Sequence, residues 1–200
     1  MKWEVQNTTR KYDGHFKVDQ IVIKHELFSG DISKELIRER VSRKNAVAVL
    51  PFDPVRDEVV LVEQFRAGAI DEERKETNPW LIEVIAGLVE EGEKLEDVAI
   101  REALEEANCR IENLHHVSSF HPSPGGFSEL AHVYIAKTNT TELGGIFGLE
   151  EEGEDIRVHV VSSDKAIEML HQGIIRSAIP MIAIFSFIQL RESLMSKWTG

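Results

Sequence analysis

Two glutamates with a helical spacing are the first residues in this chain that could do chemistry. Glu102 and Glu106 stand four residues apart in a segment that is predicted to be helical over residues 95–108. At that spacing the two carboxylates stack one turn apart, and their like charges cost stability unless a positive charge compensates. Arg101 can pair with Glu105 and leaves Glu102 and Glu106 without a partner. A divalent cation would supply that charge, because Mg²⁺ takes hard oxygen ligands such as carboxylates and substrate phosphates.

The same helix is predicted to be two-sided. At about 100° per residue, its apolar side chains fall on one face and its three central glutamates fall nearly opposite. The apolar face consists of Ile100, Ala103, Leu104, Ala107 and Ile111. Spacing alone leaves a solvated acidic helix face as the alternative interpretation.

A glycine-containing acidic loop precedes the helix and favours the metal-site interpretation. Residues 87–93 hold two glycines and three acids, directly after an apolar strand predicted over residues 81–85. A glycine at position 87 lets the chain turn sharply and leaves the Ala86 carbonyl oxygen free to point at a cation. The sequence therefore predicts that this carbonyl and the helix carboxylates share one site.

The combined spacing resembles the signature of the Nudix hydrolases. Gly87 is followed by five residues, Glu93, seven residues, and then Arg101-Glu-Ala-Leu-Glu-Glu106. One position departs from the family pattern, since Asn108 stands where a glycine is expected after the last glutamate. Asn tolerates the left-handed conformation best after Gly, so a helix C-cap is retained. The resemblance implies an αβα sandwich that hydrolyses nucleoside diphosphates linked to another moiety, with Mg²⁺ or Mn²⁺ as cofactor.

Two downstream elements resemble the ADP-ribose pyrophosphatase branch of that family. The first is the turn Ser123-Pro-Gly-Gly126, whose backbone can approach a ligand closely, with Glu129 shortly after it. The second is the acidic run at residues 150–155, ahead of a strand predicted over residues 156–161. An ordinary acidic surface loop is the alternative for this run. The resemblance implies a mobile catalytic loop with Gly153 as its hinge.

The resemblance assigns chemical roles to the acidic residues. Glu152 is implied as the general base that takes a proton from the attacking water, whose pKa bound metal lowers. AMP and ribose 5-phosphate are the implied products. Two to three divalent ions are expected per site, held by the Ala86 carbonyl, Glu102, Glu105, Glu106 and Glu154. Orientation of these ligands is expected from Gly87, Glu93 and Arg101.

The resemblance also implies a set of residues that contact the substrate. Arg66 resembles a substrate-binding arginine, whereas Arg38 and Arg43 match positions that reach into the active site of the other subunit. Phe16 is expected to stack on the adenine, where the family has an aromatic pair. An exposed surface charge is the alternative for each arginine. The full implied set is His15, Phe16, Arg38, Glu39, Arg43, Arg66, Leu88, Ser123, Pro124, Gly125 and Glu129.

The distribution of charge agrees with a concentrated acidic site. The 200 residues carry 23 Lys plus Arg against 35 Asp plus Glu, a formal net charge of -12. Residues 87–106 contribute -6 and residues 150–155 contribute -5, so the remaining chain is close to neutral. Binding to a nucleic-acid backbone needs a basic surface, and none is visible. One cysteine, the absence of a signal-like start and an apolar run at 178–188 too short to span a bilayer predict a cytoplasmic protein without membrane contact.

The elements needed to position these residues predict an α/β or α+β layered fold with a mixed sheet. We expect an N-terminal antiparallel β subdomain at residues 1–45 and a Nudix hydrolase domain at residues 46–200. The N-terminal strands bury little alone, so they are expected to be exchanged in an obligate homodimer. Strands are predicted near 16–27, 34–41, 46–50, 58–65, 81–85, 117–120, 130–136 and 156–161, and helices near 95–108, 164–172 and 177–195.

The predicted function is therefore Mg²⁺-dependent hydrolysis of ADP-ribose. Hydrolysis of another nucleoside diphosphate sugar or of a dinucleotide, such as GDP-mannose or NADH, remains an alternative within the family. A non-catalytic ADP-ribose-binding regulator is the alternative from another class. Such a regulator is expected to have lost box carboxylates and to carry an output domain, and this chain keeps the carboxylates.

Overall fold

A computed structural model describes residues 1–73, 78–149, 151 and 153–199, which belong to two compact units. Unit 1 consists of Met1–Asn45 and His121–Leu130, and unit 2 consists of Ala46–Phe120 and Ala131–Gly200. The predicted N-terminal subdomain ended at residue 45. Unit 1 also contains the loop 121–130, which comes from a distant part of the chain.

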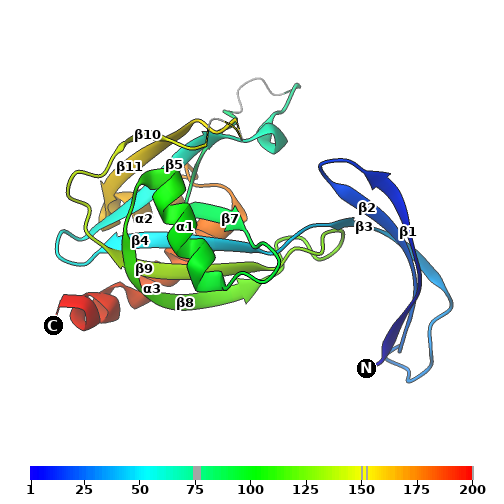
Figure 1. Ribbon diagram of the computed structural model, residues 1–200. Coiled ribbons are helices and arrows are strands. Elements are labelled where there is room, and N and C mark those ends of the chain that lie inside the picture. The colour runs from blue at the N-terminus through cyan, green and yellow to red at the C-terminus, as the bar shows by residue number, and fades with distance from the viewer. Residues whose placement is uncertain (74–77, 150, 152, 200) are drawn as a thin grey trace. The chain divides into compact units, whose positions relative to one another are not determined.

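Unit 1 is built on a three-stranded antiparallel sheet of order β1-β2-β3. Its strands are β1 (Trp3–Asp13), β2 (Lys17–His25) and β3 (Leu36–Ser42) (Figure 1). The sheet keeps large apolar side chains exposed, including Trp3 at 77% and Ile37 at 59%. Three strands without a helix leave much apolar surface in water.

The loop from the second half of the chain extends this sheet beyond β3. Val41 donates its backbone N–H to the Gly126 carbonyl at 2.7 Å, and Ser128 donates to the Val41 carbonyl at 3.0 Å. Val41 and Phe127 form a parallel bridge. The Ser-Pro-Gly-Gly turn is therefore held to the end of β3 by backbone hydrogen bonds.

Unit 2 is organised around an eight-stranded mixed sheet with the path β10-β11-β5-β4-β9-β8. β6 pairs with β5 and β7 pairs with β4, and β4 runs parallel to β9 while its other pairings are antiparallel. The strands are β4 (Ala46–Asp53), β5 (Glu58–Phe65), β6 (Trp80–Glu83), β7 (Ile85–Leu88), β8 (Ile111–Phe120), β9 (Ala131–Thr138), β10 (Gly145–Phe147) and β11 (Ile156–Ser162).

Helices cover both faces of this sheet, as Figure 1 shows. They are α1 (Leu95–Ala107), α2 (Ser163–His171) and α3 (Ala178–Thr199), with a short 3₁₀ turn η1 (Ala67–Ala69). The central strand β4 is buried along its whole length, so alternate side chains enter two cores. Leu50 and Phe52 pack towards α2 and α3, whereas Val47 and Val49 pack towards α1. The predicted αβα layering and α+β class are confirmed.

Several predicted element boundaries were wrong in detail. Neither β1 nor β10 was predicted as a separate strand. Gly87 and Leu88 belong to β7 rather than to the loop after it. Helix α2 begins one residue before the predicted start and is capped by Ser162, whose hydroxyl accepts from the Lys165 N–H at 3.2 Å.

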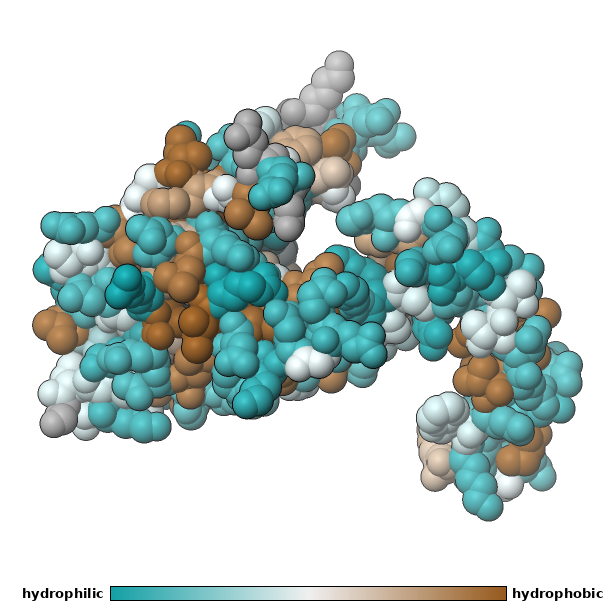
Figure 2. Space-filling view, in the orientation of Figure 1, coloured by the Kyte–Doolittle hydropathy of each residue, from teal (hydrophilic) through white to brown (hydrophobic). Residues whose placement is uncertain are grey.

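The predicted faces of α1 were also partly wrong. Ile100 and Leu104 are 38% and 42% exposed, and Figure 2 shows apolar surface over the part of unit 2 where α1 lies. Glu106, expected on the outer face, is only 3% exposed. The buried face is formed instead by Val98, Ala99, Ala103 and Ala107. Small side chains let α1 approach the sheet closely, which brings the Glu106 carboxylate inside.

The C-terminal helix α3 packs on the face of the sheet opposite α1. Phe187 meets the Phe52 ring edge-on at a centroid distance of 4.8 Å, and the Trp198 ring lies 6.3 Å from that of Phe52. With 22 residues, α3 passes a length-and-composition test for a membrane span, and a core helix of a globular domain passes the same test. Its buried contacts with the sheet are those of a core helix.

Candidate functional site

Gly87 on β7 lies directly against the Glu102 side chain on α1. A Cβ atom placed on Gly87 would lie 1.7 Å from Oε1 of Glu102 and 2.0 Å from its carboxyl carbon. Any other residue type would have to displace the Glu102 side chain, because real Cβ atoms do not approach a heavy atom so closely. Glycine at this position therefore keeps the Glu102 carboxylate against the strand.

Glu106 lies deeper, one helical turn further along α1. The Ala86 backbone N–H donates to its Oε2 at 3.1 Å. The pKa of Glu106 is raised to about 8: burial is the largest cause and the neighbouring carboxylates of Glu102 and Glu154 add to it, against the opposing effect of the Ala86 N–H and Arg66. Burial also raises the pKa of Glu102. The charged form of this pair therefore lacks a sufficient positive partner.

Glu154 brings a third carboxylate towards this pair from another part of unit 2. Its charge contributes to the raised pKa of both Glu102 and Glu106. The Leu149 N–H donates to Oε2 of Glu154 at 3.0 Å, and the Glu154 N–H donates to the Leu149 carbonyl at 3.2 Å. The acidic run at residues 150–155 and the acidic helix are thus close enough for their charges to interact.

Arg101 ties the outer carboxylates of α1 together. Its Nη1 donates to Glu102 at 2.7 Å and to Glu105 at 3.1 Å, and its Nη2 reaches Glu93 at 3.4 Å. The Leu88 carbonyl lies 3.5 Å from the same Nη2. The predicted orienting role of Arg101 and Glu93 is consistent with these contacts. From the sequence, only Glu105 was predicted as a partner of Arg101.

The carboxylate oxygens of this site are suitable ligands for a divalent cation. In this structure, however, they accept hydrogen bonds from N–H groups of the protein. Among residues 1–73, 78–149, 151 and 153–199, no three His, Cys, Asp or Glu side chains are gathered closely enough to hold a metal ion as they stand. Arg101 engages Glu102, and backbone N–H groups engage Glu106 and Glu154. A bound cation would replace these hydrogen bonds and relieve the buried negative charge.

Arg66 lies at the end of β5 and contacts an acid that the sequence did not single out. Its Nε donates to Glu83 Oε2 at 2.7 Å, and the Ser177 hydroxyl donates to Glu83 Oε1 at 2.9 Å. Arg66 remains 43% exposed and is close enough to Glu106 to lower its pKa. No sequence spacing connects Arg66 with Glu83; the β5–β6 pairing does.

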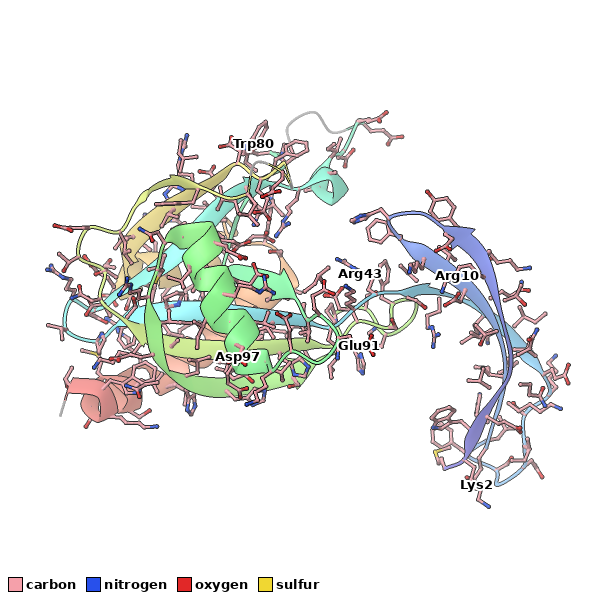
Figure 3. The ribbon with its side chains drawn as sticks, viewed as in Figure 1. Lys2, Arg10, Arg43, Trp80, Glu91 and Asp97 are labelled. Atoms are coloured by element: carbon pink, nitrogen blue, oxygen red, sulfur yellow. The ribbon has the colours of Figure 1, made fainter. Side chains whose placement is uncertain are left out.

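Unit 1 gathers a second set of predicted site residues. The Arg43 guanidinium lies over the Phe16 ring at 5.4 Å and pairs with Glu129 at 3.2 Å. His15 meets Phe16 edge-on at 5.0 Å. The Arg43 N–H donates to the Ser128 hydroxyl at 2.9 Å, so the loop that contains Ser123, Pro124 and Gly125 is joined to this group. Figure 3 labels Arg43 at the end of β3.

Arg38 and Glu39 lie apart from that group, on the exposed part of β3. Within the described part of the chain, the Arg38 guanidinium donates only to the neighbouring Ile37 carbonyl, at 2.8 Å. The predicted general base, Glu152, lies outside the described residues. Beside it, Gly153 has a left-handed φ of 70°, which suits its predicted use as a flexible position.

Asn108 confirms the expected helix end. It has φ 47° and ψ 33°, the left-handed conformation, and its N–H donates to the carbonyls of Ala103 and Leu104. The substitution of the family glycine therefore preserves the turn that ends α1.

Comparison with known proteins places the carboxylate site in a family. The model of the NUDIX domain matches residues 42–180. The chain is 46% identical over 188 residues to the ADP-ribose pyrophosphatase of Escherichia coli (strain K12), covering 94% of this chain and 88% of that protein. It is 41% identical to the ADP-ribose pyrophosphatase of Haemophilus influenzae, covering 95% of this chain and 89% of that protein.

More distant similarities point to the same fold. The chain is 35% identical to the GDP-mannose pyrophosphatase of Cronobacter sakazakii, covering 77% of this chain and 78% of that protein. A solved structure described as an ADP compounds hydrolase superposes with a TM-score of 0.69 at 21% identity, covering 100% of this chain and 98% of that one. Together with helix α1 and its carboxylates Glu102 and Glu106, these matches establish that the chain belongs to the Nudix family.

Proposed function

We propose that this protein is an ADP-ribose pyrophosphatase that hydrolyses ADP-ribose to AMP and ribose 5-phosphate with Mg²⁺ or Mn²⁺. The observation that carries the proposal is the pair of carboxylates on α1, Glu102 against Gly87 and the buried Glu106, whose pKa values the charge of Glu154 also raises. The two relatives that are 46% and 41% identical both have this activity in their names, which supports the choice of substrate.

The proposed metal ligands are the Ala86 carbonyl, Glu102, Glu106 and Glu154, with Glu105 sharing an ion. These ligands carry buried negative charge, and the pyrophosphate of the substrate is a dianion. We therefore propose that two to three divalent ions bind per site. When bound, the metal neutralises the pyrophosphate and lowers the pKa of a coordinated water. Arg101 holds the outer carboxylates in place through Glu102 and Glu105.

The proposed base is Glu152, which accepts a proton from the attacking water. As the oxygen of that water bonds to phosphorus, the bridging oxygen leaves, and the two products separate as AMP and ribose 5-phosphate. Arg66 lies beside the carboxylates and supplies a cation for the substrate phosphates, since Glu83 holds its guanidinium by one nitrogen.

The substrate-binding role of unit 1 is part of the same proposal. Phe16 offers a half-exposed ring for the adenine, and Arg43 is already stacked on that ring. We assign these residues, with Arg38, Glu39 and the loop around Ser123, to the active site of a second chain in a homodimer. The exposed apolar side chains of the unit 1 sheet support an exchanged arrangement.

A substrate panel tests the proposed activity. Purified protein with Mg²⁺ is assayed against ADP-ribose, NADH, GDP-mannose and diadenosine polyphosphates, and kcat/KM is expected to be highest for ADP-ribose. GDP-mannose is the competitor of interest, because a GDP-mannose pyrophosphatase is 35% identical to this chain. Preference for any other substrate in the panel would remove the proposed substrate and leave the family unchanged.

A single substitution tests the base. Glu152→Gln removes the proton acceptor and keeps the side-chain volume, so kcat is expected to fall about 10²–10⁴-fold while ADP-ribose binding is preserved. Steady-state kinetics and calorimetric binding separate the two effects. The neighbouring Glu151→Gln is the matched control and is expected to keep near-normal turnover. The opposite ranking of the two variants would move the base to Glu151.

A further inference from the structure

Glu83 is a nearly buried carboxylate near the acidic site, and it is not one of the proposed metal ligands. Its side chain is 12% exposed, and each of its two oxygens accepts from a different group. Arg66 Nε donates to Oε2 at 2.7 Å, and the Ser177 hydroxyl donates to Oε1 at 2.9 Å. Burying a carboxylate is costly unless it is paired and hydrogen-bonded, so Glu83 and Arg66 depend on each other.

The pairing of the central strands explains why Glu83 lies between Arg66 and the carboxylate site. β4 and β5 pair with each other at the two residue pairs nearest their connecting turn. Further from that turn, β6 pairs with β5 and β7 pairs with β4. Glu83 is the last residue of β6, and Ala86, whose carbonyl is a proposed metal ligand, lies three residues later in β7. The fold thus brings a carboxylate from this bend to the arginine that follows β5.

The backbone of Arg66 is fixed independently of its side chain. Its N–H donates to the Pro79 carbonyl at 2.9 Å, directly beyond the last residue pair of β5 and β6, Phe65 with Trp80. The rings of that pair meet edge-on with their centroids 5.1 Å apart. The direction of the long Arg66 side chain, which is 43% exposed, is set by the hydrogen bond from Nε to Glu83.

This hydrogen bond leaves the outer edge of the guanidinium for the substrate. In the part of the chain that the structure describes, the Arg66 side chain donates to Glu83 alone, and it does so through Nε. The two Nη groups form a planar fork that matches two oxygens of a phosphate group. Arg66 is near enough for its charge to act on the buried Glu106, so this fork lies near the proposed metal ligands.

Ser177 fixes the Glu83 carboxylate in turn. Ser177 directly precedes α3, and its carbonyl accepts from the Met181 N–H at 3.3 Å, so the first turn of the helix holds it. Because its hydroxyl occupies Oε1, rotation of the carboxylate about its terminal bond would break both of the hydrogen bonds that Glu83 accepts. The neighbouring Arg176 donates to the Asn78 carbonyl, which ties the same end of α3 to the segment before β6.

We propose that Glu83 is a positioning residue for the hydrolysis, which directs the free edge of Arg66 towards the substrate diphosphate and is itself held by Ser177. The inference rests on the proposed function, in which Arg66 binds the substrate phosphates. Glu83 touches neither substrate nor metal and acts through Arg66. A carboxylate suits this role because it accepts from both donors at once, and its hydrogen bond to a guanidinium is stronger than one between neutral groups.

A double-mutant cycle tests whether Glu83 acts through Arg66. Glu83→Ala is expected to lower kcat/KM about 10²-fold, the cost of a displacement of about 1 Å. Glu83→Gln keeps an oxygen that can accept from Arg66 Nε and should retain more activity. In an Arg66→Ala background, Glu83→Ala should have almost no further effect, because the residue that it positions is gone. Losses that multiply in the double variant, or equal losses in Glu83→Gln and Glu83→Ala, would overturn the proposal.

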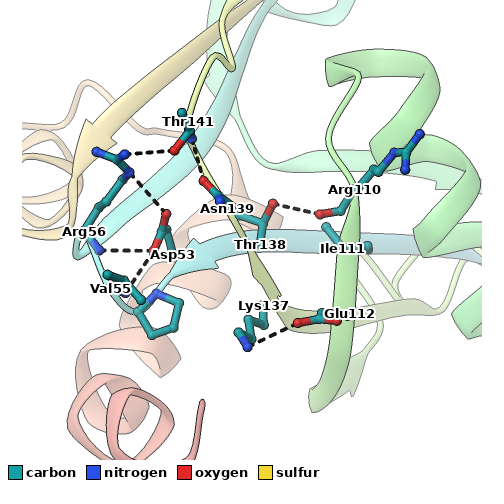
Figure 4. A pocket seen from close by; sticks show the side chains of 11 residues that line it. Asp53, Val55, Arg56, Arg110, Ile111, Glu112, Lys137, Thr138, Asn139 and Thr141 are labelled. Carbon is teal, nitrogen blue, oxygen red and sulfur yellow. Dashed lines mark hydrogen bonds and ion pairs between the residues drawn. The ribbon is translucent and has the colours of Figure 1, made fainter. Parts of the chain in front are cut away.

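Two further variants separate positioning from a general effect of losing a polar group. Ser177→Ala should lower kcat/KM by less than Glu83→Ala does, and no loss would remove Ser177 from the proposal. Glu112→Ala is the matched control, because this glutamate is 64% exposed and pairs with Lys137 at 3.2 Å on the surface (Figure 4). It should keep wild-type kcat/KM, and urea denaturation checks that all variants fold. A loss in the control equal to that of Glu83→Ala would contradict a specific role.

Binding of inorganic pyrophosphate with Mg²⁺, measured by calorimetry, repeats the cycle without turnover. Glu83→Ala is expected to weaken this binding several-fold when Arg66 is present and not at all in the Arg66→Ala background. The measurement does not require ADP-ribose to be the substrate, so failure of the proposed function and failure of this inference give different results. Unchanged pyrophosphate affinity in Glu83→Ala would show that Glu83 does not position Arg66.

Discussion

At the scale of single residues, the site depends on a glycine, which has no side chain. Gly87 has no Cβ, and the Glu102 carboxylate occupies the space that a Cβ would need, at 1.7 Å. Sequence spacing suggested that glycine was needed for a sharp turn. The structure places Gly87 inside β7, where the need is for close approach rather than for an unusual backbone conformation.

Replacement of Gly87 by alanine is therefore expected to displace the Glu102 carboxylate. A displacement of about 1 Å at a catalytic group can reduce the rate about 10²-fold, and we expect kcat/KM for ADP-ribose to fall by about that factor. Gly68→Ala is the matched control, since a Cβ there meets nothing within 4 Å. Steady-state kinetics at saturating Mg²⁺ measures both. Equal activity of the two variants would mean that Glu102 does not hold its position through Gly87.

At the scale of elements, α3 is attached to the β4–β5 turn by an ion pair. The Arg191 Nε donates to Asp57 Oδ1 at 2.8 Å, its Nη2 also contacts Asp57, and its Nη1 donates to Asp164 on α2 at 2.6 Å. Asp57 itself has a left-handed φ of 57°. One arginine thus connects the turn and both helices on that face of the sheet.

Removal of the Arg191 charge is expected to destabilise the fold. Arg191→Met keeps most of the side-chain volume and loses hydrogen bonds to two carboxylates, so the free energy of unfolding at pH 7 should fall by about 1–3 kcal/mol. Urea denaturation measures the change. Lys197→Met on the same helix is the matched control, and a similar loss in that variant would attribute the effect to α3 itself rather than to the ion pair.

The same pair makes a pH-dependent contribution to stability. The hydrogen bond from Arg191 lowers the pKa of Asp57, despite the opposing effect of burial. A lowered folded-state pKa stabilises the protein above the unfolded value, about 3.9, and this stability is lost as pH falls through the folded value. The stability difference between wild type and Arg191→Met should therefore be full above about pH 5 and shrink below about pH 4. A difference that stays constant down to pH 3 would contradict this assignment.

At the scale of the whole molecule, unit 1 has too much exposed apolar surface for an isolated module. Trp3, Tyr12 and Ile37 are 77%, 60% and 59% exposed, and Phe28 is fully exposed. Exposed apolar surface of this extent is typical of a protein–protein interface. The proposed homodimer would cover it and bring Arg43 to the active site of the partner subunit.

A mixing experiment tests the dimer and its exchanged site together. Wild-type protein is expected to sediment as a homodimer of 22.7 kDa chains. Arg43→Ala and Glu152→Gln should each be nearly inactive, and co-refolded in equal amounts they should recover about a quarter of wild-type activity. The reason is that half of the dimers would be mixed, each with one intact site. Monomeric sedimentation, or no recovery on mixing, would place Arg43 in its own chain's site or outside any site.

The parts of the fold that follow from neighbouring residues could be predicted from the sequence. Helix α1 ends at Asn108 as expected, because a left-handed C-cap depends on one residue and its immediate carbonyls. The strands at β4, β5 and β11 follow from short apolar runs. The faces of α1 could not be predicted in the same way, because small alanines allow a close packing that the wheel does not describe, and Glu106 is buried by it.

The sequence by itself determined the family signature, the layered fold and the acids that belong to the site. Their types and spacings are local properties, set by helix geometry and by the chemistry of carboxylates. Only the tertiary structure decided that Gly87 makes room for Glu102, that Glu83 holds Arg66, and that Arg43 lies between Phe16 and Glu129. Those contacts join residues up to 86 positions apart, so they depend on strand register and core packing, which no local pattern encodes.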